Sequence, residues 1–314
     1  MNLIFSPYII FLVGLIMLIY GSEIVINNCI KIANKFNVSK VIIGATVIAF
    51  GTSFPELVIS GISSLKGNSD IAISNIIGSN IANIGLVLGL LAIFKPIACF
   101  PDLRIKYNCF YLVLSTLLFS LISFLNAFNF FSGILFLILF CLFIFFIFKK
   151  YSKGEKELFE SLDETKNYSI ILKLIIGFLL IGFGSEYFIN STINLSKILG
   201  FDNNIPISMT LVALGTSLPE LITSFIALIR KEKDFAIGNI LGSNIINILL
   251  VIGFSAIINP IFVQFFELKE CLIILLFITF ILVITIYFLH SINRLIGIIF
   301  ICIYFLFIYI NFFI

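Results

Sequence analysis

The feature that most constrains this chain is a series of ten apolar stretches, each long enough to cross a lipid bilayer. A hydrocarbon core about 30 Å thick requires around 20 helical residues. The stretches are continuous rather than alternating, which predicts helices and not barrel strands. We therefore expect an all-α polytopic membrane protein with ten transmembrane helices, at residues 7–28, 38–65, 71–94, 107–126, 128–148, 169–192, 204–229, 235–258, 271–289 and 295–313.

The composition excludes a soluble protein. Hydrophobic residues make up 61% and charged residues 11% of the 314 positions, against roughly 45–50% and about 25% in soluble domains. The net charge of +3 does not indicate nucleic acid, because the basic residues lie in short loops. No cationic segment precedes the first apolar stretch, so we expect that helix to be retained rather than cleaved. The six cysteines lack CxxC spacing, which favours a packing role over disulfides or metal binding.

The Lys and Arg residues predict the orientation. With both termini outside, 16 of them lie on the cytoplasmic side and only three, Lys66, Lys197 and Lys269, lie outside. Such an excess of positive charge is typical of cytoplasmic loops. We therefore expect a plasma-membrane protein with extracellular termini and a solvated cytoplasmic linker at residues 149–168.

The two halves of the chain repeat each other. The identities fall on Gly, Ser, Thr, Asn, Pro and Glu, whereas chance similarity between apolar helices would match Leu and Ile. The aligned segments are 44–57 with 208–221 (8 of 14 identical) and 72–84 with 236–248 (10 of 13), both at an offset of 164, and 14–27 with 177–190 (6 identical) at an offset of 163.

This duplication predicts an inverted arrangement. Each repeat, at 1–148 and 169–314, holds five predicted helices, so the second repeat enters the membrane from the opposite side. The repeated motifs cover 44–84 and 208–248. Inverted repeats that hold a substrate near the bilayer midplane are an architecture of secondary transporters. The arrangement favours transport by alternating access over a channel or an enzyme.

Four carboxylates fall within the predicted spans. A charge at that depth costs at least about 2.5–3.5 kcal/mol on insertion scales, so each marks a candidate functional residue. Glu56 and Glu220 each end a repeated GTS-x-PE motif, whose proline removes a backbone donor and frees carbonyl oxygens. The other two are Glu23 and Glu186, which we interpret as polar anchors on their helices.

Helical spacing gathers further oxygen ligands around this glutamate pair. Steps of three or four residues place one set on a common helix face in each repeat: Thr46, Ala49, Ser53 and Glu56, and Thr210, Ala213, Ser217 and Glu220. A step of four does the same on the next helices, for Asn75, Ser79 and Asn83, and for Asn239, Ser243 and Asn247. An oxygen-only site suits a hard cation such as calcium. Softer metals would recruit His or Cys, yet the lone His290 lies in a predicted loop.

At these motifs the sequence resembles the calcium/cation antiporter superfamily, in particular prokaryotic sodium/calcium exchangers. The resemblance implies ion binding by helices two, three, seven and eight, with helices one and six sliding across them. It implies Glu56 and Glu220 as the central carboxylates. The other implied ligands are Thr52, Ser53, Thr216, Ser217, Ser79 and Ser243, the backbone oxygens of Ala49 and Ala213, and Asn83 and Asn247. Some family members carry Asp where this chain has Asn247.

The resemblance therefore predicts a calcium/sodium antiporter that needs no cofactor and functions as a monomer in the lipid bilayer. A calcium/proton or potassium-dependent antiporter and, less favoured, a passive cation channel remain alternatives. Flux coupling distinguishes them, because a channel passes calcium without a counter-ion. An intramembrane serine protease would need a histidine within the membrane. The chain has no Walker-type phosphate loop, so an ion gradient rather than ATP is the expected energy source.

Overall fold

The computed structural model describes residues 2–67, 69–151, 167–198, 216–262 and 265–313, and most of these residues are helical. The first half comprises α1 (Asn2–Phe36), α2 (Lys40–Ile43), the π-helix η1 (Gly44–Ile48), α3 (Ala49–Thr52), α4 (Phe54–Leu65), α5 (Ser69–Ala82), the π-helix η2 (Asn83–Leu88), α6 (Gly89–Phe94), the strand β1 (Ile97–Ala98), α7 (Leu103–Phe124) and α8 (Phe130–Tyr151). The second half comprises α9 (Asn167–Ile198), α11 (Leu218–Ile229), α12 (Lys233–Ile246), the π-helix η3 (Asn247–Ile252), α13 (Gly253–Ile258), α14 (Phe265–Ile284), the π-helix η4 (Thr285–Leu289), the strand β2 (Ser291–Ile292) and α15 (Arg294–Phe313).

The described residues form a multi-pass helical membrane protein. Seven of their helices are long and apolar enough to cross a bilayer, and an eighth span results if the bent pair Lys40–Thr52 and Phe54–Leu65 counts as one. Leu218–Ile229 and Arg294–Ile310 are shorter apolar helices. The start of the predicted span 204–229 lies outside the described residues. The first helix continues to Phe36, beyond its predicted end at 28, because the polar residues there do not break the helix.

In α3 and α4, the GTS-x-PE motif divides one span into two helices, with the break two residues before the proline. The bend of 48° between α3 and α4 falls at Ser53, and Pro55 stands in the first turn of α4. A proline at the start of a helix loses no hydrogen bond, because the first amides of a helix have no partner within it. Ser217 has nearly the same backbone angles before α11. Glu56 and Glu220 are therefore first-turn residues rather than mid-helix residues.

The duplication recurs in the folded elements. Four pairs begin and end 164 residues apart: α4 and α11, α5 and α12, η2 and η3, and α6 and α13. The short antiparallel sheet pairs Ile97 of β1 with Ile292 of β2. The isolated bridge between Phe128 and Ile261 is the equivalent pairing, because Ile261 lies 164 residues after Ile97 and Phe128 lies 164 residues before Ile292. Equivalent segments thus form equivalent long-range contacts in the two halves.

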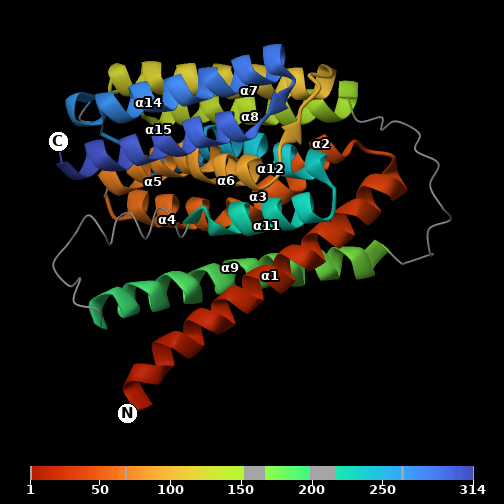
Figure 1. The fold of residues 1–314 in the computed structure, drawn as a ribbon. Coiled ribbons are helices and arrows are strands. Elements are labelled where there is room, and N and C mark those ends of the chain that lie inside the picture. The colour runs from red at the N-terminus through yellow and green to blue at the C-terminus, as the bar shows by residue number, and fades with distance from the viewer. Residues whose placement is uncertain (1, 68, 152–166, 199–215, 263–264, 314) are drawn as a thin grey trace.

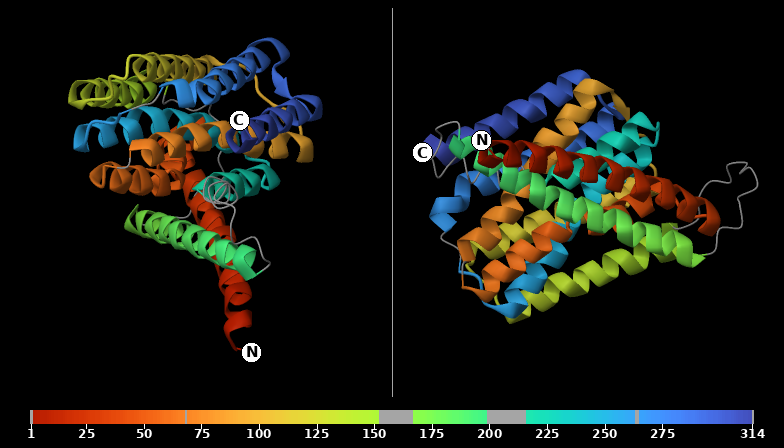
Figure 2. Two further views of the ribbon diagram at one scale, coloured as in Figure 1. Left: turned by 90° about the vertical axis from the view of Figure 1, so that its left-hand side faces the viewer. Right: turned by 90° about the horizontal axis from the view of Figure 1, so that it is seen from below.

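The helices lie in layers (Figure 1). The long helices α1 and α9 cross at one side of the molecule, and α4 and α11 form the next layer. Then come α5, α6 and α12, while α7, α8 and α14 cover the far side. Seen from below, α1 and α9 lie alongside each other across the rest of the fold (Figure 2). The segments that carry the motifs are thus enclosed between the α1–α9 pair and the outer helices.

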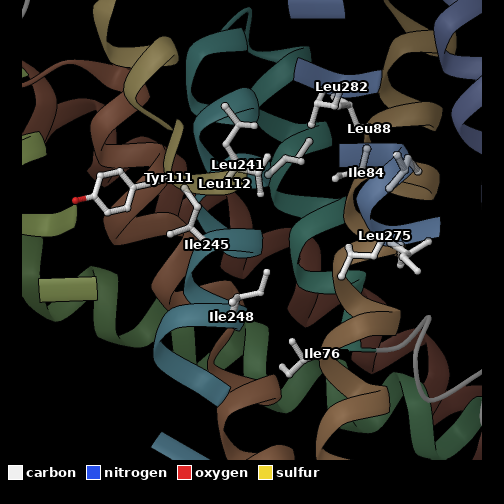
Figure 3. Packing of buried hydrophobic residues seen from close by; sticks show 14 of the residues in the cluster. Ile76, Ile84, Leu88, Tyr111, Leu112, Leu241, Ile245, Ile248, Leu275 and Leu282 are labelled. Atoms are coloured by element: carbon white, nitrogen blue, oxygen red, sulfur yellow. The ribbon is translucent and has the colours of Figure 1, made fainter. Parts of the chain in front are cut away.

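The core is built around α12. Its glycine at 238 packs directly against η1, where a Cβ atom added to Gly44 would lie 2.7 Å from the carbonyl oxygen of Phe235. Close approach of this kind through small residues is how membrane helices associate. Buried side chains from both halves and from α7 and α14 fill the space beside it (Figure 3): Ile76, Ile84, Leu88, Leu112, Leu241, Ile245, Ile248, Leu275 and Leu282. The motif helices are therefore held in a tightly packed frame.

Candidate cation-binding site

Glu56 lies in the first turn of α4 and is completely buried. The new helix that begins after Ser53 directs Glu56 into the protein, whereas Phe54 in the same turn is exposed. No donor meets hydrogen-bond geometry at either carboxylate oxygen, although the Ser79 hydroxyl lies nearby. Buried polar atoms without partners are rare in native proteins and call for an explanation. Both oxygens of Glu56 are available to a bound ion.

Glu220 lies in the first turn of α11 and is also completely buried. Its Oε1 atom accepts hydrogen bonds from the hydroxyls of Ser53, at 3.1 Å, and Ser243, at 3.3 Å. Its Oε2 atom has no hydrogen-bond partner. One oxygen of this carboxylate is therefore oriented by the protein, and the other is available to a ligand.

The two glutamates form a single electrostatic centre. They lie close enough to repel each other. Each stands at a helix N-terminus, whose partial positive charge stabilises an anion by typically 0.3–1 kcal/mol at exposed positions and up to about 2 kcal/mol when partly buried. That contribution is too small to compensate for two desolvated negative charges. A divalent cation between them would balance both charges.

Hydroxyl groups from the two halves meet around this centre. Thr52 lies 3.4 Å from Ser243 and donates to Asn239 Oδ1 at 3.1 Å. The hydroxyls of Ser79 and Thr216 are 3.3 Å apart. The Ser217 hydroxyl is buried without a hydrogen-bond partner. The structure therefore brings together residues that are between 137 and 191 positions apart in sequence.

The predicted asparagines begin the two π-helices. Neither the nitrogen nor the oxygen of the Asn83 amide has a hydrogen-bond partner. Asn247 donates from Nδ2 to Asn80 Oδ1 at 3.1 Å, and its own Oδ1 has no partner. Both side chains are fully buried. Each half thus contributes one amide oxygen that no protein group uses.

Of the two predicted backbone ligands, Ala49 and Ala213, only Ala49 lies within the described residues. The Ala49 carbonyl accepts a hydrogen bond from the Ser53 amide at 2.9 Å, and the Thr52 hydroxyl lies 3.3 Å from it. That hydroxyl has a single proton, which Asn239 Oδ1 accepts at 3.1 Å, so one lone pair of the Ala49 oxygen is left for an ion. Ala213, together with the face residue Thr210, lies outside the described residues.

A second layer of polar residues was not singled out from the sequence. Asn75 donates to Ser60 at 2.9 Å, and Asn239 donates to Ser224 at 2.9 Å, the same contact in the two halves. The asparagines had been placed on the predicted cavity face, but the serines had not. A signal was available, because Ser60 and Ser224 are identical at the 164-residue offset. The same holds for Asn80 and Asn244, which lie within the repeated GSN motif.

The donor set is made of hard oxygen atoms. In the described part of the chain, no three His, Cys, Asp or Glu side chains gather as they would around a softer metal. Calcium takes 6–8 oxygen ligands and sodium is likewise a hard cation. The buried oxygens without partners include Glu56 Oε1 and Oε2, Glu220 Oε2 and the Ser217 hydroxyl, together with Asn83 Oδ1 and Asn247 Oδ1 at the start of the two π-helices. The chemistry of these atoms fits a hard cation.

The fold and the site together define a multi-pass membrane protein with a buried cluster of oxygen atoms whose chemistry suits a hard cation. Comparison with known families then assigns it: the model of the sodium/calcium exchanger protein family matches residues 6–149 and 169–313, and the chain belongs to this family. Membership places the protein among cation antiporters of the calcium-exchanging class, whose members are transporters.

Individual relatives agree with this assignment. The chain is 36% identical over 293 residues to sodium/calcium exchanger MaX1 of Methanosarcina acetivorans, with 81% of this chain and 83% of the relative covered. It is 28% identical over 258 residues to inner membrane protein YrbG of Escherichia coli, with 79% of each covered. A structure of the sodium-calcium exchanger NCX_Mj matches with a TM-score of 0.83 and 33% identity, over 96% of both chains.

Proposed function

We propose that this protein exchanges calcium for sodium across the cell membrane and binds both ions between Glu56 and Glu220. The observation that carries the proposal is the buried pair of carboxylates with three of four oxygens unused by protein donors. Two carboxylates neutralise one calcium ion, and the same oxygens can hold sodium. The proposed ligands are Glu56, Glu220, Asn83, Asn247, Thr52, Ser53, Thr216, Ser217, Ser79, Ser243 and the backbone oxygens of Ala49 and Ala213.

The proposed architecture is ten transmembrane helices in two inverted five-helix repeats, 1–148 and 169–314, joined by the linker 149–168. The recurrence of element boundaries and of strand pairing at an offset of 164 supports it. Alternating access then requires that a movable part exposes the site to one side at a time. The α1–α9 pair suits this role, because it forms a layer of its own beside the motif helices (Figure 1).

The proposed orientation has both termini outside and the linker 149–168 inside, with the monomer as the functional unit. The distribution of Lys and Arg, 16 inside against three outside, supports this orientation. A negative interior then opposes calcium export by about 4.6 kcal/mol per 100 mV, at about 2.3 kcal/mol per elementary charge. Entry of more than two sodium ions per calcium ion would supply the electrical part of this energy.

Flux measurements in proteoliposomes test the proposal. Vesicles that hold the purified protein are loaded with sodium and diluted into sodium-free medium that contains radioactive calcium. We expect calcium to accumulate in proportion to the sodium gradient. Matched vesicles loaded with potassium or with acidic buffer test the alternative counter-ions. Equal uptake after all gradients are collapsed would contradict antiport and indicate a channel.

A further inference from the structure

Outside the ion site, α1 is attached to the end of α11 by one arginine. Arg230, the residue that follows α11, forms an ion pair with Glu23 and donates from Nη1 to Asn27 Oδ1 at 2.7 Å. Glu23 and Asn27 lie one helical turn apart, so a single guanidinium bridges two side chains of α1. Deeper in the protein, the hydroxyls of Ser22 and Thr223 are 2.9 Å apart. These contacts fix α1 against α11.

The sequence contains a second copy of the same three groups. At the offset of 163 that relates α1 to α9, Glu23 and Asn27 correspond to Glu186 and Asn190. At the offset of 164 that relates α11 to α4, Arg230 corresponds to Lys66, which follows α4. The next residue has a positive φ in both places, 75° at Gly67 and 62° at Lys231. The second copy therefore has the chemistry and the local backbone needed for an equivalent contact.

The structure forms the first contact and not the second. Glu186, Asn190 and Lys66 are all exposed, and within the described residues neither Glu186 nor Lys66 has an ion pair. α1 packs along α11, whereas α9 has no comparable packing against α4. Two copies of one contact, of which only one is made, indicate that the α1–α9 pair is docked off-centre on the motif helices.

The α1–α9 pair is itself symmetric. A Cβ atom added to Gly14 would lie 2.8 Å from the Gly184 carbonyl oxygen, and one added to Gly21 would lie 2.8 Å from the Gly177 carbonyl oxygen. The offset of 163 exchanges these two contacts. Backbones this close resist separation, because the small residues allow extensive van der Waals packing. A symmetric pair on a repeated frame has a second docking position, in which the roles of the two helices are exchanged.

We propose that Glu23–Arg230–Asn27 and Glu186–Lys66–Asn190 are two alternating latches, each formed only when the other is open. The proposal rests on the alternating-access function above. By the predicted orientation, Arg230 lies on the cytoplasmic side and Lys66 lies outside. Each latch therefore holds the α1–α9 pair against the motif helices on one side of the membrane. The Glu23–Arg230 pair is only partly enclosed, with side-chain exposures of 40% and 36%, which suits a contact that must break in every cycle. These six are positioning residues, because none of them belongs to the ion site.

Disulfide formation between introduced cysteines tests the exclusivity of the two latches. In the variant Glu186→Cys/Lys66→Cys, the rate of copper-catalysed disulfide formation is measured on the purified full chain. Mass spectrometry identifies the new bond, so the six native cysteines stay in place. We expect slow formation in this background and at least a threefold increase when Arg230→Gln is added. Lys231→Gln, which removes the same charge one residue away, is the matched control and should leave the rate unchanged.

Several outcomes would overturn the latches. The first is an unchanged rate of disulfide formation with Arg230→Gln, and the second is an equal increase with Lys231→Gln. The third is the formation of both disulfides in one molecule when the charged residues of both latches are all replaced by cysteine. Should Arg230→Gln fail to fold, Glu23→Gln opens the same latch from the α1 side. The disulfide measurement involves no ion flux, so it can fail while sodium/calcium exchange stands. It can equally succeed in a chain whose flux assay rules out sodium as the counter-ion.

Discussion

Glu56 and Glu220 occupy equivalent positions in the two halves, yet the protein holds them differently. Glu220 accepts two hydroxyl hydrogen bonds, and Glu56 accepts none. Both donors to Glu220, Ser53 and Ser243, have identical counterparts in Ser217 and Ser79. Those counterparts hold Glu56 less firmly: Ser217 has no partner, and the Ser79 hydroxyl lies near Glu56 but outside hydrogen-bond geometry, 3.3 Å from the Thr216 hydroxyl. One carboxylate is thus positioned in advance, and the other depends on its ligand.

Removal of either negative charge should have the largest effect and should erase the difference between the two glutamates. Glu56→Gln and Glu220→Gln keep the side-chain shape but leave one carboxylate to face a divalent ion. Loss of one partner of a buried charged site costs about 3–5 kcal/mol, so we expect calcium exchange to fall by at least about 100-fold in each. Proteoliposome flux measures this, with size-exclusion profiles as the control for folding. Near-normal flux in either variant would remove that glutamate from the site.

Shortening the side chain should affect calcium exchange differently at the two glutamates. Glu220→Asp withdraws the carboxylate from Ser53 and Ser243, whereas Glu56→Asp breaks no protein hydrogen bond. A hydrogen bond to a charged group contributes about 1.5–3 kcal/mol. We therefore expect the calcium concentration for half-maximal exchange to rise about tenfold more in Glu220→Asp than in Glu56→Asp. The opposite order would mean that the difference in hydrogen bonding does not persist during transport.

An added carboxylate at either asparagine should show whether the two halves respond alike to a third negative charge. Asn83→Asp and Asn247→Asp each place a third negative charge near the pair, which favours an additional proton or monovalent cation. Only Asn247→Asp also loses a hydrogen bond, the one to Asn80. We expect exchange to become more sensitive to acid or potassium in both, with a lower melting temperature only for Asn247→Asp. Flux measured against pH and potassium checks this, and unchanged profiles in active variants would remove these residues from the site.

The smallest effect should come from single hydroxyls. Ser53→Ala removes a donor to Glu220, while Ser217→Ala removes a hydroxyl that has no protein partner. A buried hydrogen bond is worth about 1 kcal/mol. Without calcium, Ser53→Ala should lower the unfolding free energy by about that amount, and Ser217→Ala should not lower it. Both should weaken stabilisation by added calcium, as measured by thermal unfolding in detergent. Equal destabilisation of the ion-free protein would remove the distinction between the halves.

The sequence predicted most of the membrane spans and pointed to the motif hydroxyls that meet beside the two carboxylates, because both rest on strong local signals. Apolar length identified seven spans that the described residues reproduce. Repeated Glu, Ser, Thr and Asn residues identified the side chains that gather around the two carboxylates. The inverted arrangement, the ligand roles and the counter-ion stay predictions. Ala213 stays untested as well, since it lies outside the described residues.

The sequence could not predict that Glu56 and Glu220 differ in their hydrogen bonds. Identical residues at a fixed offset give identical expectations, so Ser53 and Ser217 were indistinguishable until their partners were known. The difference depends on how the two halves pack around the site, and this is a tertiary property with no local signal. The position of the break at Ser53 could not be predicted from the sequence for a related reason. A proline marks a disturbed helix, but only the surrounding packing decides whether it starts a new helix or bends an old one.

The π-helices at Asn83–Leu88 and Asn247–Ile252 also bear on how the chain tolerates changes in length. A π turn holds more residues than an α turn, so each span contains a spare residue relative to a regular helix. Deletion of one residue there would restore α geometry and leave the following segment in its present phase. The buried Leu91 would keep its neighbours and Ser79 would stay in place, whereas the same deletion in a regular α segment would rotate everything beyond it by about 100°. The spare residue therefore lets one span differ in length by a residue without changing which way its two ends face.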